Sequence, residues 1–328
     1  WRDEEIKQSK FPILERADIL GCYDENHLVS KFAVYPIPMN VFGAIYPIGF
    51  ITSVSTYPEY SGQGIMSRLM YQSLVRMRQK GQSLALLYPY SIPLYRRFGW
   101  EIVSDKISYS VKDRQIPSKF QANGYVWNDP SFMNLHTRFA RETHGCLLRN
   151  SLAWEEYWRW DEDDTCVAVY FDASDLPQGY MVYLIKEDIM YIKEMIYLHR
   201  DAQKGLWKYI HAHDSMIDEV RGNTYRNESI AFEMEDGDIR ETIRPYIMGR
   251  IVDLDAFLSQ YRGVAPGSDC RISFEIEDPI LEWNCRKTTL VFQGNQCFLS
   301  QEPAPLQVRM SIGTLVKKEM SKIFKNNP

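Results

Sequence analysis

Two stretches of this sequence combine residue types and spacings that could do chemistry. In the first, residues 53–66, a strand-like segment passes through a turn containing Gly62 and Gly64 into the first turn of a helical pattern. Glycines allow consecutive backbone N–H groups to turn inward, and the start of a helix adds a partial positive charge. This geometry binds a pyrophosphate without lysine side chains, so the stretch is a candidate anion site.

The second stretch, residues 92–100, places a tyrosine shortly after the candidate anion site. The phenol of Tyr95, with an ordinary pKa of about 10, is protonated at neutral pH and can donate a proton to a group on which negative charge develops. The alternative is that Tyr95 is a core residue packed beside Phe98 and Trp100. Tyr95 is therefore a candidate general acid.

A Gly-x-Gly turn alone more often caps a helix than binds a phosphate, so the neighbouring elements must decide. Residues 64–80 place apolar side chains at three- and four-residue steps, which predicts a helix ended by Gly81. Residues 83–88 form a continuous apolar run, as in strands that are buried on both faces. The glycine turn is thus predicted to open the helix of a strand–helix–strand crossover.

The order of the predicted elements divides the chain into three parts, 1–112, 113–245 and 246–328. In the first part, about three antiparallel strands within residues 28–56 precede the crossover, and a strand at 106–111 closes the unit. The second part repeats this pattern without a Gly-rich turn. Its predicted elements are strands at 167–171, 180–186 and 190–197 and a helix at 201–220.

The third part is predicted to be a small α+β unit. Its predicted elements are a helix at 253–261, strands at 271–277 and 288–292, and a basic helix from Ser311. The whole chain is therefore expected to be an α/β protein with two related units and a smaller third one.

Composition and charge exclude several classes of function. The net charge of -5 and the pI near 5.8 supply no broad positive field, so we expect no nucleic-acid partner. The six cysteines lack the close spacing of zinc sites, so we expect no metal. Prolines and glycines interrupt the most apolar stretch, residues 34–54, so we expect no membrane helix. The chain opens without an apolar leader, and a cytoplasmic location is expected.

The combination of loop, helix and tyrosine resembles the GNAT superfamily of N-acetyltransferases. In that superfamily the acetyl-CoA loop has the form Q/R-x-x-G-x-G/A, and a later helix ends in tyrosine, followed by phenylalanine, glycine and an aromatic residue. The matching residues here are Tyr95, Phe98, Gly99 and Trp100 for the helix, and Glu59, Tyr60, Ser61, Gly62, Gln63 and Gly64 for the loop. Glu59 departs from the pattern and removes a possible donor to the phosphates, although backbone amides can serve.

The resemblance implies direct attack of an amine on the thioester of acetyl-CoA, without a covalent nucleophile. Backbone groups of Val54, Ser55 and Thr56 would bind the pantetheine amides, and the Val54 N–H would stabilise the oxyanion. Tyr95 would protonate the leaving thiolate. The residues that would hold the pyrophosphate are Gly62, Gln63, Gly64, Ile65 and Met66.

Over the whole chain, the order of a GNAT unit, a degenerate second unit and a small third domain resembles the enhanced intracellular survival (Eis) acetyltransferases. The match is clearest over residues 57–100. It implies tandem GNAT folds, each a mixed, mostly antiparallel sheet with flanking helices, and a C-terminal domain like sterol carrier protein. It also implies a homo-oligomer, hexameric in that family, that acetylates amines of aminoglycosides or lysine side chains.

The base that deprotonates the amine is not identified by a motif. Eis-type enzymes use the terminal carboxylate of a phenylalanine for this purpose, whereas this sequence ends at Pro328, and we expect that a tail is missing. Glu59 and Glu194 are the local alternatives, each also explained as an ordinary solvated or paired carboxylate.

Two other functions are open at this point. The GNAT fold could bind acetyl-CoA without turnover, or residues 246–328 could bind a lipid in an apolar interior, which we instead expect to be packed. The acceptor is also open, since aminoglycosides, polyamines, protein lysines and small metabolite amines all supply a primary amine.

Overall fold

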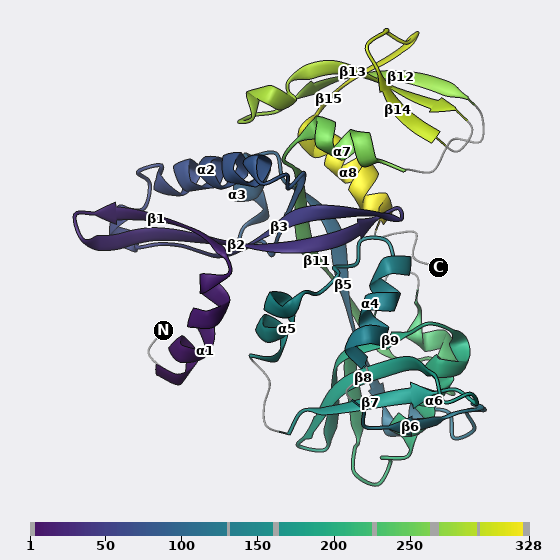
Figure 1. Ribbon diagram of the computed structural model, residues 1–328. Coiled ribbons are helices and arrows are strands. Elements are labelled where there is room, and N and C mark those ends of the chain that lie inside the picture. The colour runs from purple at the N-terminus through teal and green to yellow at the C-terminus, as the bar shows by residue number, and fades with distance from the viewer. Residues whose placement is uncertain are drawn as a thin grey trace. The chain divides into compact units, whose positions relative to one another are not determined.

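The computed structural model describes residues 4–129, 132–159, 164–224, 228–262, 269–293 and 296–323. The chain divides into two compact units, each containing segments distant in sequence (Figure 1). The first unit comprises residues 1–104, 144–160 and 246–324, and the second comprises residues 105–143, 161–245 and 325–328. The predicted domain limits at 112 and 245 stay a prediction; β5 ends at Lys112, and β11 continues across residue 245.

The sheet of the first unit begins with three antiparallel strands and continues with a parallel one. The strands β1 (Asp18–Asp24), β2 (His27–Val41) and β3 (Ala44–Thr56) form a meander. After the helix α2 (Ile65–Gln79), β4 (Leu84–Leu87) pairs in parallel with β3, and the end of β11 (Arg240–Ile251) pairs antiparallel with β4. The predicted strand–helix–strand crossover is confirmed.

The helix α2 covers one face of this sheet, as Figure 1 shows. The apolar stripe predicted from the sequence is buried, including Leu69, Met70, Leu74 and Met77. A Cβ at Gly49 of β3 would lie 2.8 Å from the Met77 side chain, so the glycine lets the helix pack closely. The sequence pattern therefore positions the start of α2 beside the end of β3.

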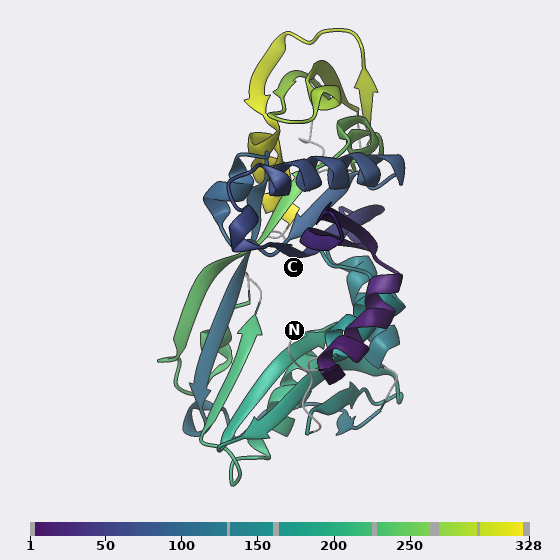
Figure 2. The same cartoon turned by 90° about the vertical axis from the view of Figure 1, so that its left-hand side faces the viewer.

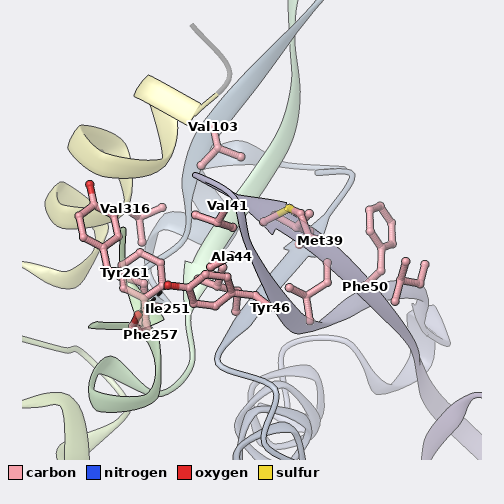
Figure 3. Packing of buried hydrophobic residues seen from close by; sticks show 14 of the residues in the cluster. Met39, Val41, Ala44, Tyr46, Phe50, Val103, Ile251, Phe257, Tyr261 and Val316 are labelled. Atoms are coloured by element: carbon pink, nitrogen blue, oxygen red, sulfur yellow. Dashed lines mark hydrogen bonds between the residues drawn. The ribbon is translucent and has the colours of Figure 1, made fainter. Parts of the chain in front are cut away.

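The C-terminal elements pack on the other face of the same sheet. The helices α7 (Leu254–Gln260) and α8 (Ile312–Ile323) carry buried side chains that join those of the β2–β3 hairpin in one core (Figure 3). The Tyr46 hydroxyl of β3 donates a hydrogen bond to the Phe257 carbonyl of α7 at 2.9 Å. A second, four-stranded sheet completes this region, in the order β14 (Gln296–Ser300), β13 (Arg286–Gln293), β12 (Cys270–Glu277) and β15 (Leu306–Ser311).

Two further helices of the first unit, α1 (Glu4–Glu15) and α5 (Ser151–Trp158), lie against β2. Lys10 of α1 is almost fully buried and contacts both Tyr35 of β2 and Glu156 of α5. Burial lowers the pKa of Lys10, and the Glu156 carboxylate opposes this effect. This ion pair compensates the buried charge and holds the two helices to the strand.

The second unit repeats the strand order of the first. The strands β7 (Cys166–Phe171), β8 (Pro177–Lys186) and β9 (Ile189–Tyr197) form a meander, followed by α6 (Arg200–His211) and β10 (Glu219–Thr224), which is parallel to β9. The strand β5 (Glu101–Lys112) pairs with β10, and β6 (Tyr125–Trp127) pairs with β7 at the edge of the sheet (Figure 2).

Helices cover both faces of the second sheet. Phe132 of α4 (Phe132–Glu142) packs on Tyr180 of β8, while a Cβ at the neighbouring Gly179 would contact Ala202 of α6. Successive side chains of a strand point to opposite faces, so α4 and α6 lie on opposite sides. The remaining short elements are α3 (Ile92–Arg96) and the 3-10 helices Pro58–Tyr60, Asp113–Gln115, Ile230–Glu233 and Glu282–Asn284.

The predicted mixed, mostly antiparallel α/β architecture is confirmed, with two corrections. The helix predicted at 201–220 ends at His211, because Val220 lies in β10, paired with both β9 and β5. The first strand begins at Asp18, before the predicted start at residue 28. Within the described ranges, no helix has the length and apolar character needed to cross a membrane.

A fully buried ion pair joins the GNAT-like part of the first unit to its C-terminal region. Arg250 of β11 donates from Nη2 to both carboxylate oxygens of Asp278, at 2.7 and 2.8 Å. The Nη1 of Arg250 donates to the carbonyl of Phe98. A Cβ at Gly99 would overlap this guanidinium, so only a glycine fits beside Arg250.

Replacing Gly99 by alanine should destabilise the protein far more than the same change at Gly81. Both glycines have a positive φ, +78° and +73°, which costs an alanine about 1–2 kcal/mol at either position. At Gly81 no described atom lies within 4 Å of a new Cβ, whereas at Gly99 the Cβ displaces Arg250. A broken buried ion pair adds about 3–5 kcal/mol. Urea unfolding measures both variants, and equal midpoints would contradict this packing.

Candidate active site

The strands β3 and β4 are paired along only part of β3. Their parallel register runs from Ile48 opposite Leu84 to Ile51 opposite Leu87, where β4 ends. β3 continues to Thr56 and is paired on its other side with β2. Residues 52–56 therefore form an open edge, where β4 no longer covers the backbone N–H and C=O groups of β3.

A β-bulge changes the direction of the backbone within the open edge. Lys31 pairs with Ser55 and Ala33 pairs with Thr52, so two residues of β3 face one residue of β2. One of them, Ser53, has φ +53°, a left-handed conformation that residues other than glycine seldom adopt. The bulge takes the backbone at residues 53 and 54 out of the regular ladder, as is common beside ligand sites.

The helix α2 begins next to the open edge without a side-chain cap. Gly64 is its N-cap, with φ +74°, and Gly62 has φ +80°. The first intrahelical bond joins the Arg68 N–H to the Gly64 carbonyl, so the N–H groups of Ile65 and Met66 have no partner within the helix. In the described part of the chain, no side chain caps this helix and no acidic residue lies in its first turn. Its partial positive charge is therefore available to an anion.

The second unit has the same strand–helix junction but fills it with its own side chains. The strand β9 pairs with β10 only from Ile189 to Tyr191 and then continues to Tyr197. At the start of α6, the His199 Nδ1 accepts a hydrogen bond from the Ala202 N–H at 3.3 Å, and an aspartate follows in the first turn. The imidazole thus caps this helix, and the carboxylate, which accepts hydrogen bonds from Tyr170 and Asn123, adds a negative charge near its start.

Side chains of the loop before α2 bind other parts of the first unit. The Tyr60 hydroxyl donates to Asp24 at the end of β1, at 2.5 Å, and this hydrogen bond raises the pKa of Tyr60. Gln63 donates to the carbonyl of Glu59 at 3.4 Å. The side chains of Glu59, Gln63 and Ser61 are exposed. Tyr60 therefore connects the loop to β1, while Gly62 and Gly64 are exposed to solvent.

Tyr95 lies in the last turn of α3 and is 5% exposed. Its ring packs edge-on against the ring of Trp100, with centroids 6.2 Å apart and an interplanar angle of 68°. Burial raises the pKa of the Tyr95 phenol above its ordinary value. The phenol is therefore protonated at neutral pH, as a general acid must be.

One buried cluster brings the predicted site residues together. Tyr95 and Ile65 belong to it, and Val54, Tyr60 and Met66 pack against it. Ser55 and Thr56 follow Val54 along the open edge. Glu194, a candidate base, belongs to the second unit, where it accepts a hydrogen bond from the Tyr180 hydroxyl.

An aromatic group lies at the end of β4. Tyr88 follows the last paired residue of β4, and its ring packs on Phe50 and Tyr246, with centroids 5.1 and 4.8 Å away. The Tyr246 hydroxyl donates to the Tyr88 hydroxyl at 3.2 Å. Tyr246 carried no sequence signal, because 158 residues separate it from Tyr88.

An open groove of about 780 Å³ lies on the C-terminal sheet, away from the residues described above. Its lining comes from residues 269–306 alone, with apolar side chains that include Ile272, Val291, Phe292, Phe298 and Leu306. Between this sheet and the helices, side chains such as Ile276, Leu290 and Leu315 are buried in the shared core. The groove and the shared core thus lie next to each other in this domain, since Phe292 belongs to the lining and also packs against the core.

The left-handed conformation of Ser53 in the bulge affects the free energy of unfolding. Replacing Ser53 by glycine should leave the free energy of unfolding unchanged or raise it by up to about 1 kcal/mol, because glycine adopts φ +53° without strain. Valine at the same position should lower it by more than about 1 kcal/mol, since β-branched side chains clash in this conformation. Ser55→Val, at an exposed extended position, is the control and should stay within about 0.5 kcal/mol of the wild type. Urea titration compares the three variants, and equal effects at the two serines would argue against the bulge.

Comparison with known protein families assigns all three parts of the chain. Residues 2–103 and residues 145–251 each match a family profile described as an acetyltransferase (GNAT) domain. Residues 254–321 match a sterol carrier protein domain. The two GNAT matches together cover more than half of the chain, and the predicted Eis-like order of domains is confirmed.

Curated relatives carry the same description. An uncharacterized N-acetyltransferase of Streptomyces avermitilis is 26% identical over 226 residues, covering 59% of this chain and 53% of that protein. A second one, from Streptomyces griseus subsp. griseus, is 20% identical over 240 residues, covering 63% of this chain and 57% of that protein. The chain thus spans about half the length of the curated relatives it matches.

Solved structures share the fold over nearly the whole chain. A conserved protein of unknown function from Enterococcus faecalis V583 superposes with a TM-score of 0.88 at 24% identity, covering 97% of this chain and 83% of that one. Eis1 from Mycobacterium abscessus superposes with a TM-score of 0.79 at 18% identity, covering 98% and 86%. The chain therefore contains two GNAT domains, the first with an uncapped helix start beside an open strand edge, and a C-terminal sterol carrier protein domain.

Proposed function

We propose that the first GNAT domain transfers the acetyl group of acetyl-CoA to a primary amine by direct attack. The observation that carries this proposal is the contrast between the two strand–helix junctions. At α2 the helix N-terminus is uncapped and has no acidic residue in its first turn, whereas at α6 the His199 side chain caps the helix and Asp201 adds a negative charge to the first turn. The start of α2 is therefore the better site for a pyrophosphate.

In the proposed complex, the backbone of the chain holds the donor. The loop from Gly62 to Met66 binds the pyrophosphate, and the open edge at Val54, Ser55 and Thr56 binds the amides of the pantetheine arm. The bulged Val54 N–H donates to the thioester oxygen as it becomes an oxyanion. Because these are backbone groups, Glu59 in place of a loop donor still permits binding.

The reaction follows from the nucleophile, the leaving group and the acid. The amine nitrogen attacks the thioester carbon and forms a C–N bond, the C–S bond breaks, and the thiolate takes the proton of Tyr95. The amine loses its proton to a base that lies outside the residues assigned here. Burial of Tyr95 keeps the acid protonated, so its ionisation does not limit the rate near neutral pH.

The acceptor is the finer part of the proposal. An aminoglycoside, a polyamine or a lysine side chain all supply the primary amine, and the packed rings of Tyr88, which follows the end of β4, and Tyr246 are the proposed contact for such a group. We also propose that the protein works as a homo-oligomer in the cytoplasm. Light scattering of the purified protein measures the oligomeric state directly.

Calorimetric titration with acetyl-CoA tests the donor site. The wild-type protein should bind with micromolar affinity, and the double variant Gly62→Glu, Gly64→Glu should lose binding, because it places two carboxylates in the loop that meets the pyrophosphate. The matched control is Gly43→Glu, Gly81→Glu, which adds the same charge at two other glycines of positive φ. Absence of binding by the folded wild type would overturn the proposed function.

Tyr95→Phe tests the acid. The variant should lower kcat by about 10²–10⁴-fold while leaving the acetyl-CoA affinity unchanged, because only the proton donor is lost. Tyr46→Phe removes another buried hydroxyl, the one bound to the Phe257 carbonyl, and should leave kcat intact. Acetyl-CoA binding without turnover of any amine class would favour the non-catalytic alternative, and a lipid bound in the C-terminal groove would favour the lipid-binding alternative.

A further inference from the structure

We infer that Arg250 and Asp278 are positioning residues through which the sterol carrier protein domain holds the catalytic tyrosine in place. This inference rests on the function proposed above. It assigns the C-terminal domain a part in acetyl transfer, since Asp278 lies in that domain while Tyr95 lies in the first GNAT domain.

The guanidinium of Arg250 is placed by the sheet. Arg250 of β11 is paired with Ala85 of β4, and directly paired residues share a face. Ala85 belongs to the buried cluster that contains Tyr95, so the Arg250 side chain emerges on the same side as α3. Its relative exposure is 0%, and its two terminal nitrogens have different partners.

One of these partners fixes the end of α3. Arg250 Nη1 binds the carbonyl of Phe98, and the Phe98 N–H in turn donates to the Tyr95 carbonyl at 2.9 Å. The Trp100 N–H reaches the same Tyr95 carbonyl at 3.4 Å. The turn that carries Tyr95 is thus connected to Arg250 by two hydrogen bonds in series.

The other partner is held firmly by its own loop. The Asp278 carboxylate accepts the N–H groups of Ile280 and Leu281 at 3.1 and 3.0 Å, and the Asn284 amide at 2.9 Å. The Asn284 amide also reaches the Val252 carbonyl at 3.3 Å, close to Arg250 in the chain. The carboxylate therefore has a fixed position from which it orients the guanidinium.

Stability alone does not account for an ion pair at this place. A buried ion pair is often no more stabilising than apolar side chains of similar volume, because both ions lose their hydration. An apolar pair, however, offers no donor to the Phe98 carbonyl. The guanidinium supplies that donor, and Gly99 leaves the space for it. The buried guanidinium of Arg250 therefore fixes the Phe98 carbonyl, close to Tyr95 in the chain.

A double-mutant cycle tests this inference. The variant Arg250→Met, Asp278→Asn removes both charges and leaves an amide oxygen for the loop N–H groups, so it should fold. Misplacement of Tyr95 should lower kcat by about 10- to 100-fold with unchanged acetyl-CoA affinity. In a Tyr95→Phe background the same changes should lower kcat no further, because the acid they position is absent. An equal loss of kcat in both backgrounds, or no loss in either, would overturn the inference.

The matched control is Phe257→Leu, which weakens the packing of the same domain on the sheet without touching α3. It should leave kcat unchanged in the folded protein. Rescue of kcat by Arg250→Lys, which keeps one donor for the Phe98 carbonyl, should be partial. A loss of kcat in Phe257→Leu equal to that in the Arg250 and Asp278 variant would show general destabilisation and overturn the inference.

A readout independent of turnover separates this inference from the proposed function. With 3-fluorotyrosine at position 95, the ¹⁹F resonance should shift and its pKa should fall in the Arg250 and Asp278 variant, but not in Phe257→Leu. If the wild type transfers no acetyl group yet the resonance responds in this way, the proposed function fails and the positioning role stands. An unchanged resonance and pKa would overturn the positioning role.

Discussion

The candidate site depends on the point at which β4 stops covering β3. Parallel pairing ends at Ile51 and Leu87, yet β3 runs on to Thr56 against β2 alone. Residues 52–56 are half-buried or exposed, so the backbone groups that β4 leaves uncovered can accept a partner from outside the chain. The bulge at Ser53 lies within this edge, and one buried cluster connects Val54 with Ile65 at the start of α2 and with Tyr95. A donor with amides and a pyrophosphate would supply the missing partners.

The two GNAT domains share a strand order but differ at the start of the helix. Both units contain a three-stranded meander, a helix and a parallel fourth strand, and in both the parallel pairing ends before the third strand does. The difference lies in a few residues at the helix start. His199 caps the first turn of α6 and Asp201 adds a negative charge to it, whereas the first turn of α2 has neither a side-chain cap nor an acidic residue in the described chain. The two domains therefore differ in the chemistry of the helix start and not in strand order.

The sequence predicted those parts of the site that depend on local patterns. The stripe of α2, the apolar run of β4 and the position of Tyr95 follow from spacings within a few residues of each other, which is where periodicity is informative. The left-handed Ser53 was not predictable in this way, because its conformation arises from the register of β3 with Lys31 and Ala33. Local patterns carry no information on such pairing.

Long-range contacts explain the other errors and omissions. The apolar residues after His211 continue a helical spacing, but Val220 belongs to a strand because β9 and β5 are available on both sides of it. Likewise, the contact of Arg250 with Phe98 joins residues 152 positions apart. No propensity of either segment predicts that pairing. Tertiary contacts determine the secondary structure and the partners of such residues, which include those that connect the domains.

The C-terminal domain supports the sheet of the first unit from outside. Tyr95, the proposed acid, lies in α3 and not in a strand, so its position depends on contacts outside the ladder of the sheet. Arg250 leaves β11 on the face of α3, and Asp278 reaches it from the C-terminal domain, while Tyr46 and Phe257 join the two parts on the opposite face. Contacts on both faces make the third domain a part of the framework that holds the site. These contacts give the sterol carrier protein domain a structural part in the protein that does not depend on lipid binding.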